Sequence, residues 1–192
     1  MSDTTHSLTD DELARLPRGV QAVKEDKTLL HPERVDGYVR LILRTGMHPT
    51  VLAHPEEYNL SVEAKNPSRL TLSWDRPKKK GLEARCVAYL EADKWRWVPS
   101  FLMGLKEEPD CEKSITRYIE MAGRKAGIPG TVSPRALRHT AIRLALDRGM
   151  SVADARDYFN VSTKILLGYA RMKDTERHLR VQQVLDATGD SQ

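Results

Sequence analysis

Apolar residues recur at helical spacing early in the chain and then alternate with polar residues in its middle part. From Glu33 to Gly46 an apolar side chain occurs every three or four residues, which predicts a helix that ends at Gly46. The period then changes to two in three runs, over about residues 60–65, 70–75 and 82–90. This alternation predicts a three-stranded antiparallel sheet.

Helical patterns return after the third predicted strand. They cover about residues 94–105, 109–126, 133–148, 151–159, 162–172 and 175–187. Glycines at 127 and 149 stand where two of these helices are expected to end. A helix, a small sheet and a run of helices predict an α+β fold, mostly helical with a small three-stranded antiparallel sheet.

The two ends of the chain are more polar. Residues 1–30 are expected to be a tail or linker with one short helix over 10–16, capped by Thr9. Residues 188–192 are expected to be a frayed C-terminal tail. One domain is therefore predicted over residues 31–187, a length that suffices for a substantial core.

Charge and cysteine content narrow the function classes. Thirty-one Lys and Arg against 27 Asp and Glu give a net charge of +4, which favours a polyanionic partner only weakly. Cys86 and Cys111 lack the spacing of a zinc site or a disulfide framework. No secretory signal and no apolar run of membrane-spanning length occurs, so a cytoplasmic protein without a membrane partner is expected.

The segment Ser133-Pro134-Arg135-Ala136-Leu137-Arg138-His139-Thr140 carries the strongest chemical signal. Ser133 suits the N-cap, and Pro134 suits the first helical position. Arg135, Arg138 and His139 stand at i, i+3 and i+4, so they share one face near the positive end of the helix dipole. This arrangement favours a bound phosphate; the alternative is a solvated basic turn.

A phosphodiester can be broken by metal-activated water or by a side-chain nucleophile. Six histidines form no HxxxH or HxH pair, no paired carboxylates stand at metal-ligand spacing near them, and no phosphate-binding loop motif occurs. The second route therefore remains, and it needs no cofactor. Tyr169 is the candidate nucleophile, since adjacent cations can stabilise its phenolate; the alternative is a packing tyrosine.

Four segments, in this order, resemble the catalytic domain of the tyrosine recombinases, the phage-integrase family. They are LILRTGMH at 41–48, WDRPKKKG at 74–81, SPRALRHT at 133–140 and the stretch through Tyr169. The resemblance extends over about residues 33–187. It implies a DNA-integrating or DNA-recombining enzyme that acts on double-stranded DNA without a metal or nucleotide, and that self-associates on its sites.

The resemblance also implies roles for single residues. Tyr169 would form the covalent 3′-phosphotyrosine, and Arg138 matches the second catalytic arginine. Lys78 matches the lysine that protonates the leaving 5′-oxygen, with Lys79 or Lys80 as alternatives, or the three lysines only contact the DNA backbone. Arg76, Lys79, Lys80 and His139 are expected to contact DNA or support the site.

Three positions depart from the family pattern. His48 stands where the family has its first arginine, and Arg44, one turn earlier, is the alternative. Arg135 replaces a histidine or lysine and cannot serve as a base, because it stays protonated. The later histidine or tryptophan has no match over residues 158–161. Together these departures predict slow, altered or inactive chemistry.

Residues 151–166 also support a different class of protein. An apolar helix, a short turn through Asn160 and a second helix after Ser162 are typical of a helix-turn-helix DNA-binding regulator. In that interpretation Ser162, Thr163 and Lys164 approach a major groove, and Tyr169 is a packing residue. The predicted sheet and the SPRALRHT segment would then have no assigned role.

Overall fold

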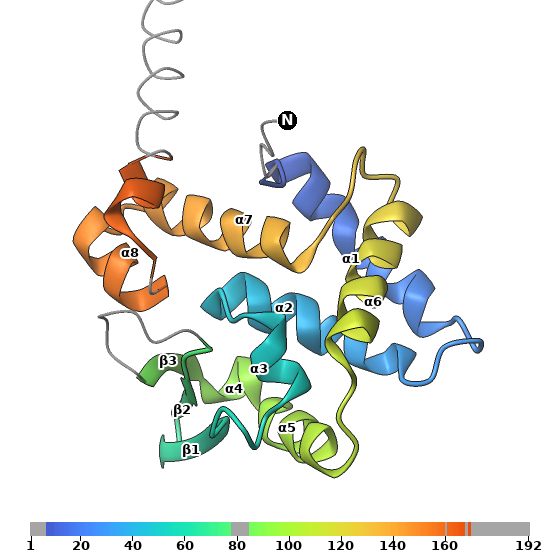
Figure 1. Cartoon of the computed structure of the whole chain (residues 1–192), viewed down its shortest axis with the longest axis horizontal. Coiled ribbons are helices and arrows are strands. Elements are labelled where there is room, and N and C mark those ends of the chain that lie inside the picture. The colour runs from blue at the N-terminus through green and yellow to red at the C-terminus, as the bar shows by residue number, and fades with distance from the viewer. Residues whose placement is uncertain (1–6, 78–84, 160, 168, 170–192) are drawn as a thin grey trace, which may run out of the picture. The chain divides into compact units, whose positions relative to one another are not determined.

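The computed structural model describes residues 7–77, 85–159, 161–167 and 169 (Figure 1). The chain forms two compact units, Met1–Ile142 and Arg143–Gln192. The first contains α1 (Asp10–Lys24), a 3-10 helix η1 (Pro32–Arg34), α2 (Val35–Thr45), α3 (Pro49–Ala53), β1 (Ser61–Asn66), β2 (Arg69–Asp75), β3 (Arg85–Glu91), α4 (Ala92–Trp95), α5 (Val98–Glu107) and α6 (Glu112–Lys125). Helix α7 (Pro134–Asp147) runs from the first unit into the second, which also holds α8 (Val152–Phe159).

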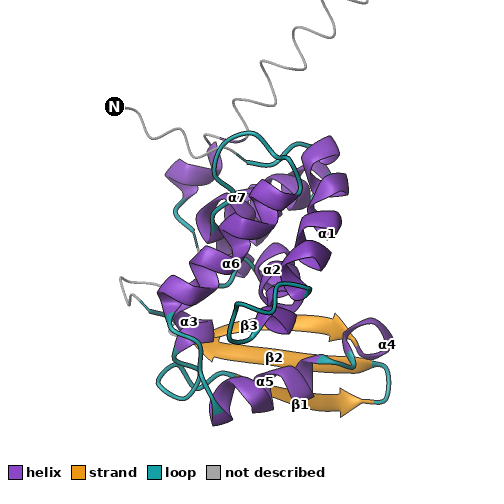
Figure 2. Cartoon of the chain, turned by 90° about the vertical axis from the view of Figure 1, so that its right-hand side faces the viewer, coloured by secondary structure: helices purple, strands orange, loops and turns teal. Residues whose placement is uncertain are grey.

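The three strands form one antiparallel sheet in the order β1-β2-β3. The residues that alternate as apolar in the sequence face each other across β2 and β3, in the pairs Leu70–Leu90, Leu72–Ala88 and Trp74–Cys86. All six are buried. Figure 2 shows β1 at the sheet edge farthest from α1 and α6. The period-two pattern therefore predicted both the sheet and its buried face.

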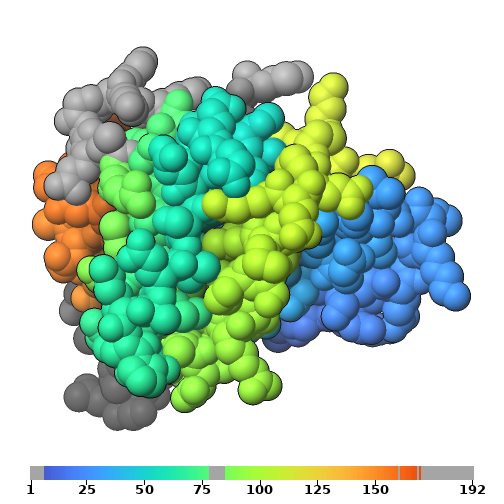
Figure 3. Space-filling view, turned by 90° about the horizontal axis from the view of Figure 1, so that it is seen from below, coloured from blue at the N-terminus to red at the C-terminus, as the bar shows by residue number. Residues whose placement is uncertain are grey.

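Helices of the first unit pack around α6. Helix α1 lies along α6, and α2 and α3 also contact it. In the space-filling view, α5 and α6 form a band between the N-terminal helices and the strands (Figure 3). Since Gly46 ends α2 with a left-handed φ of 63°, the predicted stop at this glycine is confirmed. Together with the sheet, these helices give the mostly helical α+β fold that the sequence predicts.

Three helix predictions need correction. The helix expected over 94–105 is two helices, α4 and α5, because Pro99 suits the first turn of a new helix and cannot continue an old one. Helix α6 begins at Glu112 rather than 109, after Asp110 has formed a buried ion pair. The short helix α3 was not predicted. Of the two helices expected over 162–187, the structure describes helical backbone at 163–167 and 169.

The first 30 residues were expected to be mostly a tail, and for residues 8–24 this is wrong. Helix α1 extends to Lys24 and buries Leu16, Val20 and Val23. The predicted Thr9 cap is present: its side chain accepts from the Glu12 amide at 3.3 Å, and Glu12 accepts from the Thr9 amide at 2.8 Å. Pro17 removes one helical hydrogen bond, but packing on α6 continues the helix past it.

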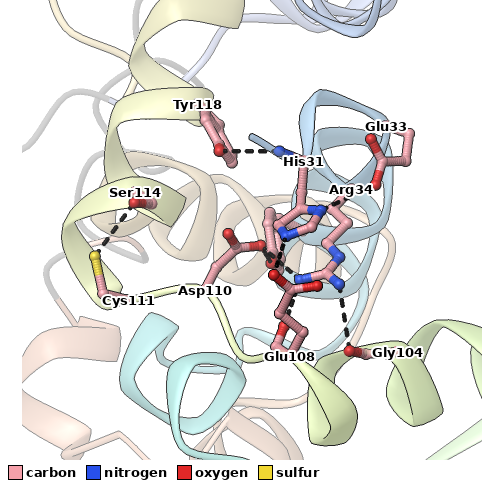
Figure 4. Close-up of polar contacts among 10 residues, drawn as sticks. His31, Glu33, Arg34, Gly104, Glu108, Asp110, Cys111, Ser114 and Tyr118 are labelled. Carbon is pink, nitrogen blue, oxygen red and sulfur yellow. Dashed lines mark hydrogen bonds and ion pairs between the residues drawn. The ribbon is translucent and has the colours of Figure 1, made fainter. Parts of the chain in front are cut away.

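A buried ion pair holds the α5–α6 connection against η1 and α2 (Figure 4). The Arg34 guanidinium contacts the Asp110 carboxylate at 3.1 Å and donates to the Glu108 carbonyl at 2.6 Å. The Tyr38 hydroxyl donates to the same carboxylate at 2.5 Å. Burial, with the charge and hydrogen bond of Asp110, raises the pKa of Tyr38 above its ordinary value. Asp110 thereby fixes where α6 begins.

Gly19 allows α1 and α6 to approach closely. A Cβ at this position would lie 1.9 Å from the Ala122 carbonyl oxygen, whereas a Cβ at Gly104 in α5 would lie no nearer than 4.0 Å to the Arg34 guanidinium. Gly19→Ala should therefore lower the free energy of unfolding by about 1–3 kcal/mol through overpacking. Gly104→Ala is the matched control and should raise it by up to about 1 kcal/mol through helix propensity. Denaturant unfolding measures both; equal effects of the two changes would contradict this packing.

Candidate functional site

The cationic start of α7 has the cap that the sequence predicts. The Ala136 amide donates to Ser133 Oγ at 3.1 Å, and the Leu137 amide donates to the Ser133 carbonyl at 3.0 Å. Pro134, at the first helical position, is buried. Arg135 is exposed, while Arg138 and His139 are partly buried. The helix start therefore presents cations at a surface and is itself anchored.

Arg138 connects α7 to the end of α2. Its guanidinium donates a hydrogen bond to the carbonyl of Gly46, 92 residues away in sequence. Gly46 is buried and is followed directly by Met47 and His48. The structure thus brings together two of the segments that carry the family resemblance, 41–48 and 133–140.

A second long-range contact holds α7 in place. The Thr140 hydroxyl accepts a hydrogen bond from the Leu8 amide at 2.8 Å and donates to the Ala136 carbonyl at 2.8 Å. Thr140 and Leu8 are both fully buried. The segment before α1 is therefore fixed to the same helix that carries Arg138.

His48 caps the short helix α3. Its Nδ1 lies 2.7 Å from the Thr50 hydroxyl oxygen and 3.3 Å from the Thr50 amide nitrogen. The Thr50 hydroxyl in turn donates to Glu112 Oε2, at the start of α6, at 2.7 Å. His48 itself is exposed, so a side chain oriented by two atoms of Thr50 stands at the surface, in the turn whose Gly46 carbonyl binds Arg138.

His139 follows Arg138 and is about half buried. Desolvation, then the charges of Arg135 and Arg138, lower the pKa of its imidazole below the ordinary 6.5. The folded chain thus holds His139 neutral at pH 7, while the unfolded chain binds its proton more readily. The resulting stability is present above about pH 6.5 and is lost as the pH falls through the lower folded-state pKa.

The predicted hairpin is formed by β2 and β3, which end in the pair Asp75–Arg85. Residues 76–84 connect the two strands. Lys78, Lys79 and Lys80 lie outside the described residues. Arg76 is described and partly buried; burial lowers the pKa of its guanidinium below the ordinary value, against a smaller opposite effect of Cys86. The choice among the three lysines stays a prediction.

Tyr169 belongs to the second unit and Arg138 to the first. Tyr169 has helical backbone and a partly buried side chain, beyond the helical residues 163–167. The Ile165 and Leu166 amides donate to the Ser162 carbonyl at 3.0 and 3.3 Å, so this helix begins where the sequence indicates. A contact between Tyr169 and the Arg138 guanidinium stays a prediction.

Sequence reasoning missed two residues of this site, Thr50 and Glu112. Thr50 follows a His-Pro pair and gave no signal beyond a turn. Glu112 lies 62 residues further along, on another helix, and no local spacing connects the two. Only the packing of α3 on α6 makes them neighbours.

No group of three or more His, Cys, Asp or Glu side chains in the part of the chain that the structure describes is arranged to hold a metal ion. None of the helices described here has the length and apolar character needed to cross a membrane.

Comparison with solved structures identifies proteins of the same fold. The chain matches XerH site-specific recombinase bound to palindromic difH substrate in a post-cleavage complex, with a TM-score of 0.69 and 13% identity, over 95% of this chain and 54% of XerH. It matches XerH bound to difH in a pre-cleavage complex with a TM-score of 0.63 and 14% identity, over 90% of this chain and 52% of that one. It matches XerA recombinase with a TM-score of 0.63 and 19% identity, over 93% of this chain and 65% of XerA.

These matches confirm the predicted recombinase-like α+β fold. The chain spans between about half and two thirds of the length of those recombinases. No family model and no curated protein sequence matches it.

The lowered pKa of His139 can be tested by removing one of its causes. Arg135→Gln should raise the pKa of His139 towards 6.5, because it removes a nearby positive charge. Arg117→Gln, which removes an exposed cation of α6, is the control and should leave the value unchanged. NMR titration of the imidazole resonances measures both. A value at or above 6.5 in the unmodified chain would contradict the account.

Proposed function

We propose that this chain is a tyrosine-recombinase-like domain that cleaves and rejoins double-stranded DNA through a covalent phosphotyrosine. The observation that best supports the proposal is the hydrogen bond from Arg138 to Gly46, at the turn that carries His48. It unites two segments that resemble the family's catalytic segments, on a fold shared with XerH, which was solved bound to difH substrate.

The hydrogen bond to Gly46 orients the Arg138 guanidinium so that it can hold a phosphate. A guanidinium has five N–H donors in one rigid plane, so the bond to the Gly46 carbonyl fixes the direction of the other donors. Arg135 adds an exposed positive charge one turn earlier on the same face. The two arginines would hold the nonbridging oxygens of a DNA phosphodiester, where negative charge develops during attack.

The proposed reaction needs no cofactor. The Tyr169 oxygen attacks the phosphorus, a new O–P bond forms, and the bond to the 5′-oxygen breaks. Lys78, or Lys79 or Lys80 in its place, gives its proton to the leaving oxygen. The energy of the broken bond is kept in the protein–DNA ester, so a 5′-hydroxyl can reverse the reaction.

Slow turnover follows from the residues that differ from the family. His48 offers fewer donors than an arginine and a charge that depends on pH. Removing one donor to a developing oxyanion typically slows a reaction by about 10²–10³-fold. We therefore propose that cleavage is slower than in a recombinase with the full residue set.

A DNA-binding member of the same fold without turnover is the second candidate. The residues at 48 and 135 favour it, because both would weaken catalysis while Arg135 keeps a positive charge at the site. A helix-turn-helix regulator is less well supported: helices α8 and 163–167 fit it, but the sheet and the Arg138–Gly46 contact have no role in it.

A DNA-cleavage assay separates the first two candidates. With nicked duplexes of randomised sequence, the chain should form an adduct that survives denaturation, and Tyr169→Phe should abolish it. Tyr158→Phe, in α8 of the same unit, is the matched control and should keep it. Arg138→Lys should slow adduct formation by about 10²-fold or more, because the planar fork is lost.

Two results would overturn the enzymatic proposal. An unchanged adduct in Tyr169→Phe would reject this nucleophile. Salt-sensitive DNA binding with no adduct from the unmodified chain would favour the DNA-binding candidate.

A further inference from the structure

We propose that Glu112 is a positioning residue that acts through the Thr50 hydroxyl to hold the Nδ1–H of His48, so that the protonated ring directs its Nε2–H at a DNA phosphate. This inference deepens the proposed function and rests on it. It gives a role to a contact between α3 and α6 that the family resemblance does not use.

The three side chains form a hydrogen-bonded row. Glu112 Oε2 lies 2.7 Å from Thr50 Oγ1, and Thr50 Oγ1 lies 2.7 Å from His48 Nδ1. Thr50 and Glu112 are partly buried, and His48 is exposed at the outer end. The row thus runs from a carboxylate inside the α3–α6 contact to an imidazole at the surface.

Counting hydrogens fixes the direction of each bond. A carboxylate only accepts hydrogen bonds, and a threonine hydroxyl has one hydrogen to donate. The Thr50 hydroxyl gives that hydrogen to Glu112, so towards His48 it can only accept. Nδ1 must then be the donor, and it carries the ring proton of the neutral imidazole.

One contact favours the other tautomer. The Thr50 amide points towards Nδ1 at 3.3 Å, and it would need an unprotonated nitrogen as its acceptor. The amide and hydroxyl contacts compete for the same ring atom. The hydroxyl contact prevails because it is shorter and because the negative charge of Glu112 supports it.

The consequence for DNA binding follows from the remaining nitrogen. With Nδ1 tied to Thr50, the ring orientation is set and Nε2 is the atom that meets a ligand. A phosphate oxygen only accepts hydrogen bonds, so the form that binds DNA is the imidazolium, which donates from Nε2 to the phosphate while its Nδ1–H stays on Thr50. Arg138, bound to Gly46 in the same turn, approaches from α7. Glu112 therefore helps His48 to bind a phosphate at the position where the family has an arginine.

The tautomer can be measured without DNA. In the unmodified chain, ¹⁵N NMR of the His48 ring should show the Nδ1–H form above its pKa. Thr50→Val removes the hydroxyl at nearly constant shape and should shift His48 towards the Nε2–H form; Thr50→Ser keeps the hydroxyl and should not. An Nε2–H form in the unmodified chain, or the same tautomer in Thr50→Val, would overturn the inference.

The effect on chemistry is tested by adduct formation. Thr50→Val and Glu112→Gln should each slow the adduct by about 10-fold, by analogy with the loss of a hydrogen-bond partner behind a metal-binding histidine. Thr50→Ser should retain the rate. In a His48→Ala background neither change should slow it further; equal slowing there would mean a merely structural role.

The two proposals fail in different ways. An Nδ1–H tautomer in a chain that forms no adduct would reject the recombinase function. An adduct formed by a chain whose His48 is in the Nε2–H form would reject the role of Glu112.

Discussion

The hydrogen bond from Arg138 to the Gly46 carbonyl is the contact on which the candidate site depends. Gly46 ends α2 in a left-handed conformation that other residues adopt only with strain, and its carbonyl then serves as acceptor for a side chain from α7. One bond thus fixes the direction of a guanidinium and brings it to the turn that carries His48.

The rest of the first unit supports that contact. Helix α1 packs on α6, and Leu8, just before α1, binds Thr140 of α7. Asp110 sets where α6 begins, and the first residue of α6, Glu112, reaches the His48 turn through Thr50. The helices that stabilise the first unit therefore also position the charged side chains of the site. A packing change at α6 would disturb the cationic surface as well.

Much of the fold and of the candidate site could be predicted from the local sequence, because the signals are periodic or come from residues adjacent in the chain. Alternating residues gave the buried face of the sheet, and Ser133 gave the cap of α7. The features that the sequence did not predict depend on tertiary packing. Pro17 interrupts the helical pattern, yet α1 continues because its apolar face is buried. The Thr50–Glu112 hydrogen bond joins residues from two helices, and no spacing in the sequence predicts it.

The central proposal is that a DNA phosphate binds between the Arg138 guanidinium and the His48 turn and is attacked there by Tyr169. The most direct test is a crystal structure of the Tyr169→Phe chain bound to a DNA duplex that the unmodified chain cleaves. We expect a backbone phosphate hydrogen-bonded to Arg138 and to His48 Nε2, with the substituted aromatic ring at position 169 beside its phosphorus. DNA bound elsewhere, with no phosphate at Arg138, would contradict the account.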